Sequence, residues 1–491
     1  MTHASDEQDQ SFAPDRRGFL GVALVSSAAV CSPVAAQGTG FEGVWNGVLR
    51  SGSITLRLQL NVGPGNAATL TSVDENEPPR PASSVTIRGD EITVAFGSIS
   101  ASFEGRLAND RLEGRWRQLF HNIPIVFTRA ATGGAGSGGG SPALTADRLV
   151  RRRREAQIPA LGAAWRRADG RQSVLVDGLR STRSDVRVEA SDRWHLGSVT
   201  KSMTATIIAR YVAAGVLSWD DTAGGVLGQS TPDMRQEYRS ATLLELLSHR
   251  SGLQANLGAR EQRPFVDASG PIITQRLAFA REALRQRPAG PPRDTFLYSN
   301  NGYVVAAAML ETRIGMPWEV AAQRSLFEPL GLASAGFGPP GSPGAVDEPL
   351  GHFEPDWNWE DGRPRRPVVF GGDRPMDNVT AMGPAGRVHM NLGDLLTYLE
   401  AHAREPASLL AGDDWRRLHT PPFGGDYALG WTVRNDGTLW HNGSNTYWYA
   451  EVCVQKAQGV VAAAVANDGV EDVTFPAVGE TLLEAVAAAR A

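Results

Sequence analysis

The sequence predicts a multidomain chain in which a small all-β barrel or sandwich precedes a mixed α/β domain. Residues 41–131 contain short strand-like runs between turn signals, most clearly at 56–62, where apolar and polar residues alternate. Residues 132–142 are rich in glycine, which is typical of a flexible linker. Residues 143–491 begin and end with strand-like runs around a mainly helical middle, which predicts a sheet whose N- and C-terminal strands meet.

Length and composition narrow the class of protein. A chain of 491 residues with 42% hydrophobic and 21% charged residues is typical of a globular protein with two or three domains. Its formal net charge of −5 argues against nucleic acid as a partner. We therefore expect the ligand to be a small molecule or a peptide, and the oligomeric state is not readable from the sequence.

The first 36 residues are typical of an export signal. Arg16 and Arg17 precede the apolar run 19–30, and small residues at 34–36 offer a cleavage site. This pattern resembles a twin-arginine signal peptide, which predicts a periplasmic or secreted protein. The apolar run is too short to span a bilayer, so no stable membrane insertion is expected after cleavage. The alternative is an uncleaved disordered tail. Cleavage would leave Cys453 as the one cysteine, which excludes an intramolecular disulfide.

The predicted β-domain, residues 41–131, shows no chemistry of its own. Glu42-Gly43-Val44-Trp45 recurs in form as Glu113-Gly114-Arg115-Trp116, and we expect both tryptophans to pack inside. It contains no paired carboxylates, no Ser–His pairing and no metal-ligand spacing. The expected strands are 56–62, 68–73, 85–88, 92–96, 99–103, 112–116 and 123–128.

The second domain, residues 143–491, has a mixed pattern. A helix over 145–156 carries four consecutive arginines, 151–154, which we expect on a solvated face. A hairpin follows at 160–166 and 172–177, and residues 205–335 are mainly helical. Near the C-terminus we expect four strands and a closing helix, at 427–433, 438–440, 447–453, 460–465 and 473–489.

Ser198 and Lys201 form the candidate reaction centre. If a helix begins near Ser198, the spacing of three residues puts both side chains on one face, one turn apart. A serine needs an adjacent base, and a lysine serves as one only when burial or neighbours depress its pKa. The apolar run 203–216 supplies such burial, and the chain has just one other lysine, Lys456. The alternative is a structural role, in which Ser198 caps the helix and Lys201 reaches solvent.

Three further motifs follow Ser-x-x-Lys along the chain. They are Tyr298-Ser299-Asn300, the run Leu246–Leu253, and His441-Asn442-Gly443-Ser444. Together they resemble the β-lactamase-related serine hydrolases, which include class C β-lactamases, penicillin-binding D-Ala-D-Ala carboxypeptidases, D-aminopeptidases and family-VIII esterases. The resemblance covers roughly residues 149–488 and implies a β-lactamase/transpeptidase-like domain, with an antiparallel sheet flanked by helices plus a helical subdomain.

The resemblance also implies roles for individual residues. Ser198 would be the nucleophile, Lys201 its base and Tyr298 the proton donor to the leaving group. Asn300 would hydrogen-bond Lys201 and the substrate amide. Backbone N–H groups of Ser198 and Ser444 would form the oxyanion hole beside Gly443. No metal or cofactor is expected.

His441 is the one departure from the class C pattern, which has Lys-Thr-Gly there. A lysine grips a substrate carboxylate, whereas a histidine, with an unperturbed pKa of about 6.5, is mostly neutral at pH 7. The sequence therefore predicts an exported serine hydrolase that cleaves an ester or amide in the manner of an esterase or D-aminopeptidase. Two alternatives remain, a β-lactamase or D-Ala-D-Ala carboxypeptidase, and a catalytically silent penicillin-recognition-like binding protein.

Overall fold

The computed structural model describes residues 40–51, 54–72, 79–97, 101–118, 121–130, 141–266, 268–354 and 365–491. Internal contacts divide the chain into two compact units, Met1–Gly136 and Ser137–Ala491, and each is described by itself. The predicted signal peptide, residues 1–36, lies outside the described residues, as do residues 132–140 of the predicted linker.

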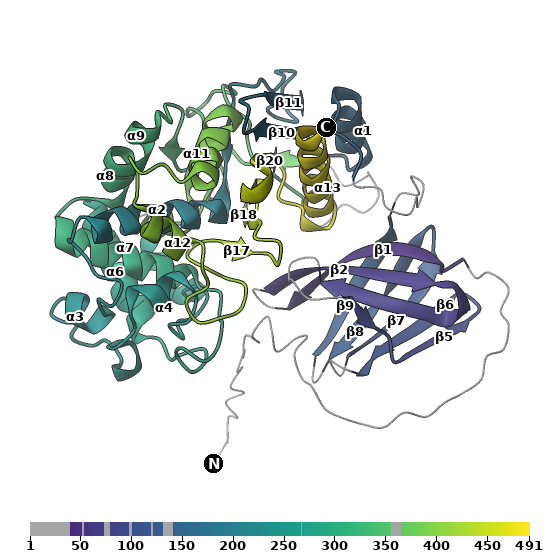
Figure 1. The fold of residues 1–491 in the computed structure, drawn as a ribbon, viewed down its shortest axis with the longest axis horizontal. Coiled ribbons are helices and arrows are strands. Elements are labelled where there is room, and N and C mark those ends of the chain that lie inside the picture. Colours follow the sequence, from purple (N-terminus) through teal and green to yellow (C-terminus); the bar gives the residue numbers. More distant parts are fainter. Residues whose placement is uncertain are drawn as a thin grey trace, which may run out of the picture. The chain divides into compact units, whose positions relative to one another are not determined.

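The described part of the first unit is one antiparallel sheet of nine strands (Figure 1). The spatial order is β4-β3-β2-β1-β9-β8-β7-β6-β5, so the sheet is a meander in which the first long strand also pairs with the last. The strands are β1 Gly43–Ser51, β2 Ile54–Gly63, β3 Ala67–Ser72, β4 Arg80–Pro81, β5 Ser84–Arg88, β6 Glu91–Phe96, β7 Ala101–Ala108, β8 Arg111–Gln118 and β9 His121–Arg129.

Alternating side chains build the core of this unit. In β3 and β6 every second residue is buried, which is the pattern of a sheet with one face turned inward. Trp45 and Trp116 are both fully buried in this core, and Trp116 stacks on Phe96 with ring centroids 5.8 Å apart. The prediction of an all-β first domain is confirmed, and its architecture is a single curled sheet.

The second unit is built on a six-stranded antiparallel sheet in the order β11-β10-β20-β19-β18-β17. β10 from the start of the unit pairs with β20 near its end, with Leu161 opposite Ala466. The predicted meeting of N- and C-terminal strands is therefore confirmed. The strands are β10 Ala160–Arg167, β11 Gln172–Gly178, β17 Thr432–Val433, β18 Leu439–Ser444, β19 Tyr449–Gln455 and β20 Val460–Ala466.

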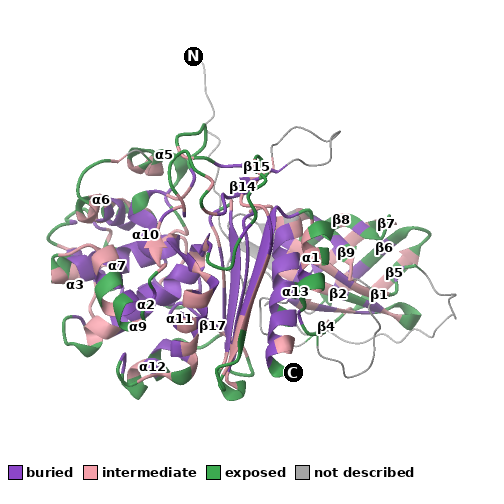
Figure 2. Cartoon of the chain, turned by 90° about the horizontal axis from the view of Figure 1, so that it is seen from above, coloured by how far each residue is buried: buried purple, intermediate pink, exposed green. Residues whose placement is uncertain are grey.

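Helices cover both faces of this sheet, as Figure 2 shows with the strands nearly edge-on. α1 (Ala146–Glu155) and α13 (Glu471–Arg490) lie on one face, and α11 (Leu392–Arg404) lies on the other, beside α2 (Thr200–Ala213). The residues of β20 alternate between the two cores: Ala462, Ala464 and Ala466 join the cluster under α13, and the residues between them join the larger cluster. The mixed α/β prediction for this domain is confirmed.

The remaining helices form the predicted helical subdomain and the segments next to it. Arg276 is fully buried there, and its charge is compensated by Glu311 and Glu319. These helices are α3 Ala223–Leu227, α4 Leu243–Leu247, α5 Ala259–Gln262, α6 Ile272–Arg285, α7 Asn300–Ile314, α8 Trp318–Ala322, α9 Glu328–Leu330, α10 Gly383–Gly386 and α12 Gly412–Leu418. Two small sheets complete the unit, from β12 Arg193–His195, β13 Gly336–Phe337 and β16 Val388–Asn391, and from β14 His352–Phe353 with β15 Arg366–Pro367.

Two local predictions were wrong. The segment 427–433 is a tight turn that leaves only β17 as strand, because Gly430 has a φ of +78° and packs against the backbone of α2. The arginine run is not wholly solvated: Arg152 pairs with Glu480 and Glu484, and Arg153 pairs with Asp177. These ion pairs attach α1 to α13 and to β11.

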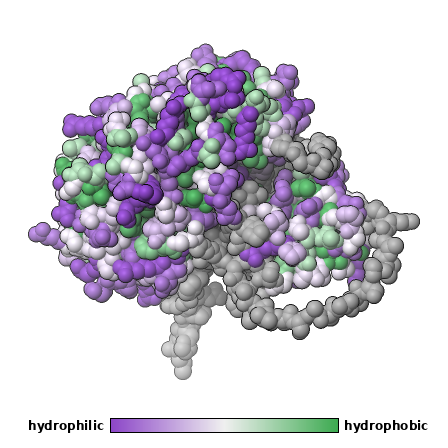
Figure 3. All heavy atoms as spheres, in the orientation of Figure 1, coloured by the Kyte–Doolittle hydropathy of each residue, from purple (hydrophilic) through white to green (hydrophobic). Residues whose placement is uncertain are grey.

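Hydrophilic and hydrophobic residues are interspersed over the face of the molecule seen in Figure 3. The large apolar residues that remain exposed are scattered along the described chain, from Val126 to Leu483. Within the described ranges, no helix combines the length and the apolar character needed to cross a membrane.

Candidate active site

Ser198 lies in a tight turn between β12 and α2. The turn is a 3₁₀ segment, Gly197–Val199, so the regular α-helix begins two residues after Ser198. Gly197 has a φ of +50°, and a Cβ on it would lie 2.4 Å from the Ser444 nitrogen. Glycine is therefore required here, both by the left-handed backbone and by the strand that passes it. Ser198 itself is half-buried.

Lys201 is fully buried, and its Nζ lies 2.9 Å from Ser198 Oγ. The same nitrogen donates to Asn300 Oδ1 and to the Ala385 carbonyl, both at 2.6 Å. Burial disfavours the ammonium form, so the pKa of Lys201 lies well below its ordinary value. A neutral amine has two N–H groups and one lone pair. The two carbonyl oxygens can take the N–H groups, which leaves the lone pair directed at the Ser198 hydroxyl.

Tyr298 and Asn300 reach this centre from the start of α7. Ser299, and not Asn300, caps the helix, because its Oγ accepts from the Gly302 N–H at 3.1 Å. The Asn300 side chain is thereby left to bond Lys201. The ring of Tyr298 is half-buried, and its centroid lies 4.9 Å from Lys201 Nζ. The structure thus brings Ser198, Lys201, Tyr298 and Asn300 together.

β18 carries the other predicted residues past the serine turn. A Cβ on Gly443 would lie 2.1 Å from the Leu196 oxygen and 2.4 Å from the Ser198 nitrogen. The backbones of the strand and the turn are therefore in direct contact, and a side chain at position 443 would separate them. This packing puts the Ser444 backbone beside Gly197 and Ser198, where two N–H groups can converge on one oxygen atom.

His441 lies on the same strand and is only 3% exposed. Its Nδ1 lies 2.5 Å from the Asn442 carbonyl, and its Nε2 lies 3.0 Å from Tyr427 Oη. A carbonyl can only accept, so Nδ1 carries a proton, and Nε2 can accept from the tyrosine hydroxyl. These contacts fit a neutral ring.

Sequence reasoning missed three residues that contact the predicted ones. Ala385 acts through its backbone oxygen, Asn256 accepts from Asn300 Nδ2 at 2.8 Å, and Tyr427 bonds His441. Tyr427 was visible in the sequence only as the first residue of the expected strand 427–433. The contact of Ala385 is made by its backbone carbonyl, which does not depend on residue type, so the sequence gives no sign of it. Asn256 lies in an irregular loop, where no periodic pattern marks it.

The loop residue His249 lies against the site without reaching Ser198. Its Nδ1 accepts from the Ser299 N–H at 3.0 Å, and its ring packs on Tyr298 with centroids 4.3 Å apart. It holds the segment that carries Tyr298. Within the described ranges, no group of three or more His, Cys, Asp or Glu side chains has an arrangement that could hold a metal ion.

The second unit matches a known family and known folds. The model of the family described as Beta-lactamase matches residues 146–487. Penicillin-binding protein 4 of Amycolatopsis lactamdurans is 25% identical over 362 residues, which cover 66% of this chain and 84% of that protein. D-amino acid amidase from Ochrobactrum anthropi SV3 superimposes with a TM-score of 0.57 at 18% identity, over 70% of this chain and 98% of that chain. A D-stereospecific amidohydrolase from Streptomyces sp. superimposes with a TM-score of 0.53 at 19% identity, over 69% and 98%. These two likenesses concern the fold.

Proposed function

The chain belongs to the beta-lactamase family, and on that basis we propose that it is a serine hydrolase that forms an acyl-enzyme at Ser198. One observation carries the proposal: a fully buried lysine with a lowered pKa lies 2.9 Å from the serine oxygen. A serine and a base at this distance are the minimum that nucleophilic catalysis needs.

The proposed reaction gives each of these residues a defined role. Ser198 Oγ attacks the substrate carbonyl carbon, and its proton passes to the lone pair of Lys201 Nζ. The carbonyl oxygen becomes an oxyanion that accepts from the Ser198 and Ser444 N–H groups. Tyr298 donates a proton to the leaving amine or alcohol as the bond to carbon breaks. Lys201 then returns a proton to the Tyr298 oxygen. Water then hydrolyses the ester of Ser198 by the same route in reverse.

An ester or amide without a carboxylate group is the substrate class that the site favours. His441 stands where a lysine would supply a fixed positive charge, and its contacts fit a neutral ring. The names of the two structural neighbours, a D-amino acid amidase and a D-stereospecific amidohydrolase, support an amide of a D-amino acid among the candidates. The relative named penicillin-binding protein 4 favours a second candidate, a D-Ala-D-Ala carboxypeptidase or β-lactamase.

We also propose export, with residues 1–36 as the signal peptide, 41–131 as a β-domain, 132–142 as a linker and 143–491 as the hydrolase. Arg16-Arg17 before an apolar run supports this division. N-terminal sequencing of the mature protein should begin near Gln37. A mature protein that still begins at residue 1 or 2 would contradict it.

Covalent labelling tests the proposed chemistry. A fluorophosphonate probe should label the wild-type protein at Ser198, and the Ser198→Ala variant should neither be labelled nor turn over substrate above background. One purified sample assayed with p-nitrophenyl esters, D-amino acid amides and nitrocefin distinguishes the substrate classes. A folded wild-type protein that resists the probe and hydrolyses none of them would be a silent binding protein.

A further inference from the structure

Two backbone segments far apart in the sequence must keep a fixed relation if their N–H groups are to bind one oxyanion. The Ser198 nitrogen belongs to the turn after β12, and the Ser444 nitrogen belongs to the end of β18. Two glycines, Gly197 and Gly443, permit the close approach of the two segments. Glycines allow the contact but do not fix it, so side chains must hold the two segments in place.

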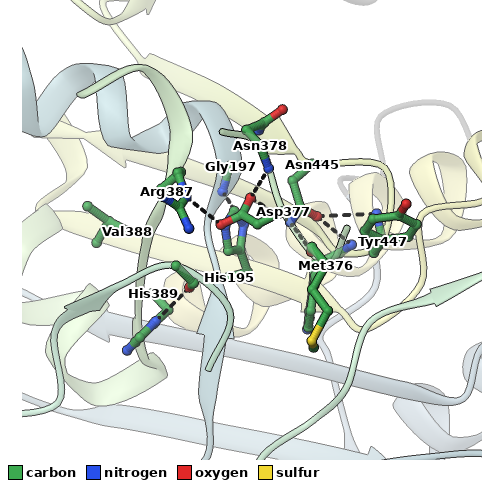
Figure 4. A network of polar contacts seen from close by, with 12 residues as sticks. His195, Gly197, Met376, Asp377, Asn378, Arg387, Val388, His389, Asn445 and Tyr447 are labelled. Carbon is green, nitrogen blue, oxygen red and sulfur yellow. Dashed lines mark hydrogen bonds and ion pairs between the residues drawn. The ribbon is translucent and has the colours of Figure 1, made fainter. Parts of the chain in front are cut away.

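Asp377 is such a side chain, and its carboxylate is 3% exposed (Figure 4). Its Oδ2 accepts from His195 Nε2 at 3.1 Å and from Arg387 Nε at 2.9 Å. Its Oδ1 accepts from Asn445 Nδ2 at 3.0 Å and from the Asn378 N–H at 2.8 Å. Burial by itself raises the pKa of Asp377, but its contacts with His195, Arg387 and Asn445 outweigh burial and hold the pKa below the ordinary value. The group is therefore an ionised, fully bonded carboxylate.

One arm of this network reaches the serine turn through His195. The Gly197 N–H donates to His195 Nδ1 at 3.2 Å, so Nε2 must carry the proton that Asp377 accepts. The ring also stacks on Trp448, with centroids 5.6 Å apart. An Asp–His pair next to a serine suggests a general base. Here, however, the second ring nitrogen is occupied by the backbone of Gly197, which fits a positioning role.

The other arm reaches the end of β18 through Asn445, the residue after Ser444. Its Nδ2 bonds Asp377, and its Oδ1 accepts from the N–H groups of Tyr447 and Trp448, each at 3.2 Å. The amide of Asn445 thus fixes the turn that follows the strand. As Figure 4 shows, a single carboxylate contacts His195, whose ring bonds Gly197, on one side and Asn445, the residue after Ser444, on the other.

We propose that Asp377 is a positioning residue for the oxyanion hole, which sets the spacing of the Ser198 and Ser444 N–H groups through His195 and Asn445. The proposal rests on the proposed function. Because the N–H groups meet full negative charge only in the tetrahedral state, a displaced donor should weaken that state and leave ground-state binding nearly intact. Removal of one oxyanion-hole donor costs about 10²–10³ in kcat, so a misplaced one should cost roughly 10–10³.

The test pairs kinetics with a tetrahedral analogue. Asp377→Asn keeps the shape but loses an acceptor, and should lower kcat for a p-nitrophenyl ester with KM within about threefold. Affinity for an alkylboronic acid, which forms a tetrahedral adduct at serine, should fall in proportion to kcat/KM. Asp192→Asn is the matched control: that carboxylate is likewise buried, with 2% exposed, and is paired with an arginine, Arg180, outside the network. It should lower Tm and leave the boronate affinity unchanged.

Two single-arm variants keep the proposal testable if Asp377→Asn does not fold. His195→Gln and Asn445→Ala each break one arm, and each should lower kcat and boronate affinity in parallel. If the folded variants keep both within twofold of wild type, or show only a lower Tm, as the Asp192→Asn control should, with no loss of boronate affinity, the proposal is overturned. Failure of the proposed function would look different, since the wild-type protein would then resist the fluorophosphonate probe. Asp377→Asn should still be labelled at Ser198, more slowly.

Discussion

The amide of Asn256 orients the amide of Asn300. Asn300 Nδ2 donates to Asn256 Oδ1 at 2.8 Å, so Asn300 Oδ1 faces the other way, 2.6 Å from Lys201 Nζ. An amide oxygen at this point stabilises an N–H donor without adding a full charge. Lys201 Nζ therefore has a hydrogen-bond partner that carries no negative charge. Without such a charge to raise it, the pKa of Lys201 is lowered by burial.

Asn300→Asp should shift the pH dependence of activity. A carboxylate beside Nζ favours the ammonium and raises the pKa of Lys201, by about one to three units for a close opposite charge. Because the neutral amine is the proposed base, the rise of kcat/KM with pH should move to higher pH, with activity lost at pH 7 and regained in alkali. Asn256→Asp is the control, since it preserves the acceptor for Asn300 Nδ2 and should shift the profile less. An unmoved profile in Asn300→Asp would show that Lys201 does not set it.

Lys201→Met should remove the proposed base and leave the rest of the site in place. Methionine has an unbranched side chain of similar length, fits a buried position and cannot take a proton. Loss of general-base catalysis should lower kcat by roughly 10²–10⁴. The matched control is Lys456→Met, at the only other lysine, which pairs with Glu405. Steady-state kinetics and Tm for both proteins check this, and equal activities would contradict the role of Lys201.

Residues 142–491 should fold and act without the β-domain. The apolar core around Trp45 and Trp116 shares no residue with the three apolar clusters of the second unit. A chain that starts at Pro142 should show one cooperative thermal transition and kcat/KM for simple esters close to that of the whole protein. Insoluble or inactive product, next to an active full-length protein, would mean that the β-domain completes the core or the site.

Acid should destabilise the second unit through His352. This ring is fully buried, donates from Nδ1 to the Asn467 carbonyl at 2.8 Å and accepts from the Thr182 N–H on Nε2 at 3.1 Å. Burial lowers the pKa of His352 to about 4, below the value of about 6.5 expected in the unfolded chain. The unfolded state then binds more protons between these values, so the stability is complete above pH 6.5 and declines towards pH 4.

The expected loss from His352 is up to about 3 kcal/mol across that window. Glutamine can both donate and accept but does not titrate, so His352→Gln should flatten the dependence of the unfolding free energy on pH between 4 and 6.5. Urea unfolding at several pH values measures the slope. Identical slopes in the two proteins would exclude His352 as the acid-sensitive group.

Patterns that repeat in the sequence were enough to predict the layers of the fold. Alternation located most strands, and the motif around Ser198 placed the start of α2 within two residues. The prediction of a strand over 427–433 failed because Gly430 turns the chain against α2. β1 was also not predicted as a strand, because only Glu42–Trp45 at its start belongs to a pattern that recurs in the sequence.

The candidate site was predictable where its residues act through side chains in short motifs. Asp377 follows a stretch rich in Gly and Pro, with no periodicity and no motif, and its partners come from β12, from Arg387 between α10 and β16, and from the turn after β18. Such a residue becomes visible only when the fold brings those elements together. Ala385 contributes a carbonyl oxygen, which depends on backbone direction and not on residue type.

His441→Lys should change which substrates the protein prefers. The histidine is nearly buried, with Nδ1 against the Asn442 carbonyl and Nε2 against Tyr427 Oη. A lysine there would bring a full positive charge to β18, three residues before the proposed oxyanion donor Ser444. Charge-assisted hydrogen bonds are roughly twice as strong as neutral ones, so a substrate carboxylate should gain and an uncharged ester should not. The ratio of kcat/KM for nitrocefin to that for p-nitrophenyl butyrate should therefore rise.

Tyr427→Phe separates the gained charge from the lost tyrosine contact, since it removes the hydroxyl that bonds His441 and leaves the imidazole in place. If the new charge is responsible, the ratio should rise in His441→Lys and stay near the wild-type value in Tyr427→Phe. Equal rises in both variants would assign selectivity to the hydroxyl. A wild-type protein that hydrolyses nitrocefin far faster than every ester and amide, or a lysine variant with an unchanged ratio, would show that His441 does not select against carboxylates. The β-lactamase or carboxypeptidase alternative would then be the better description of this chain.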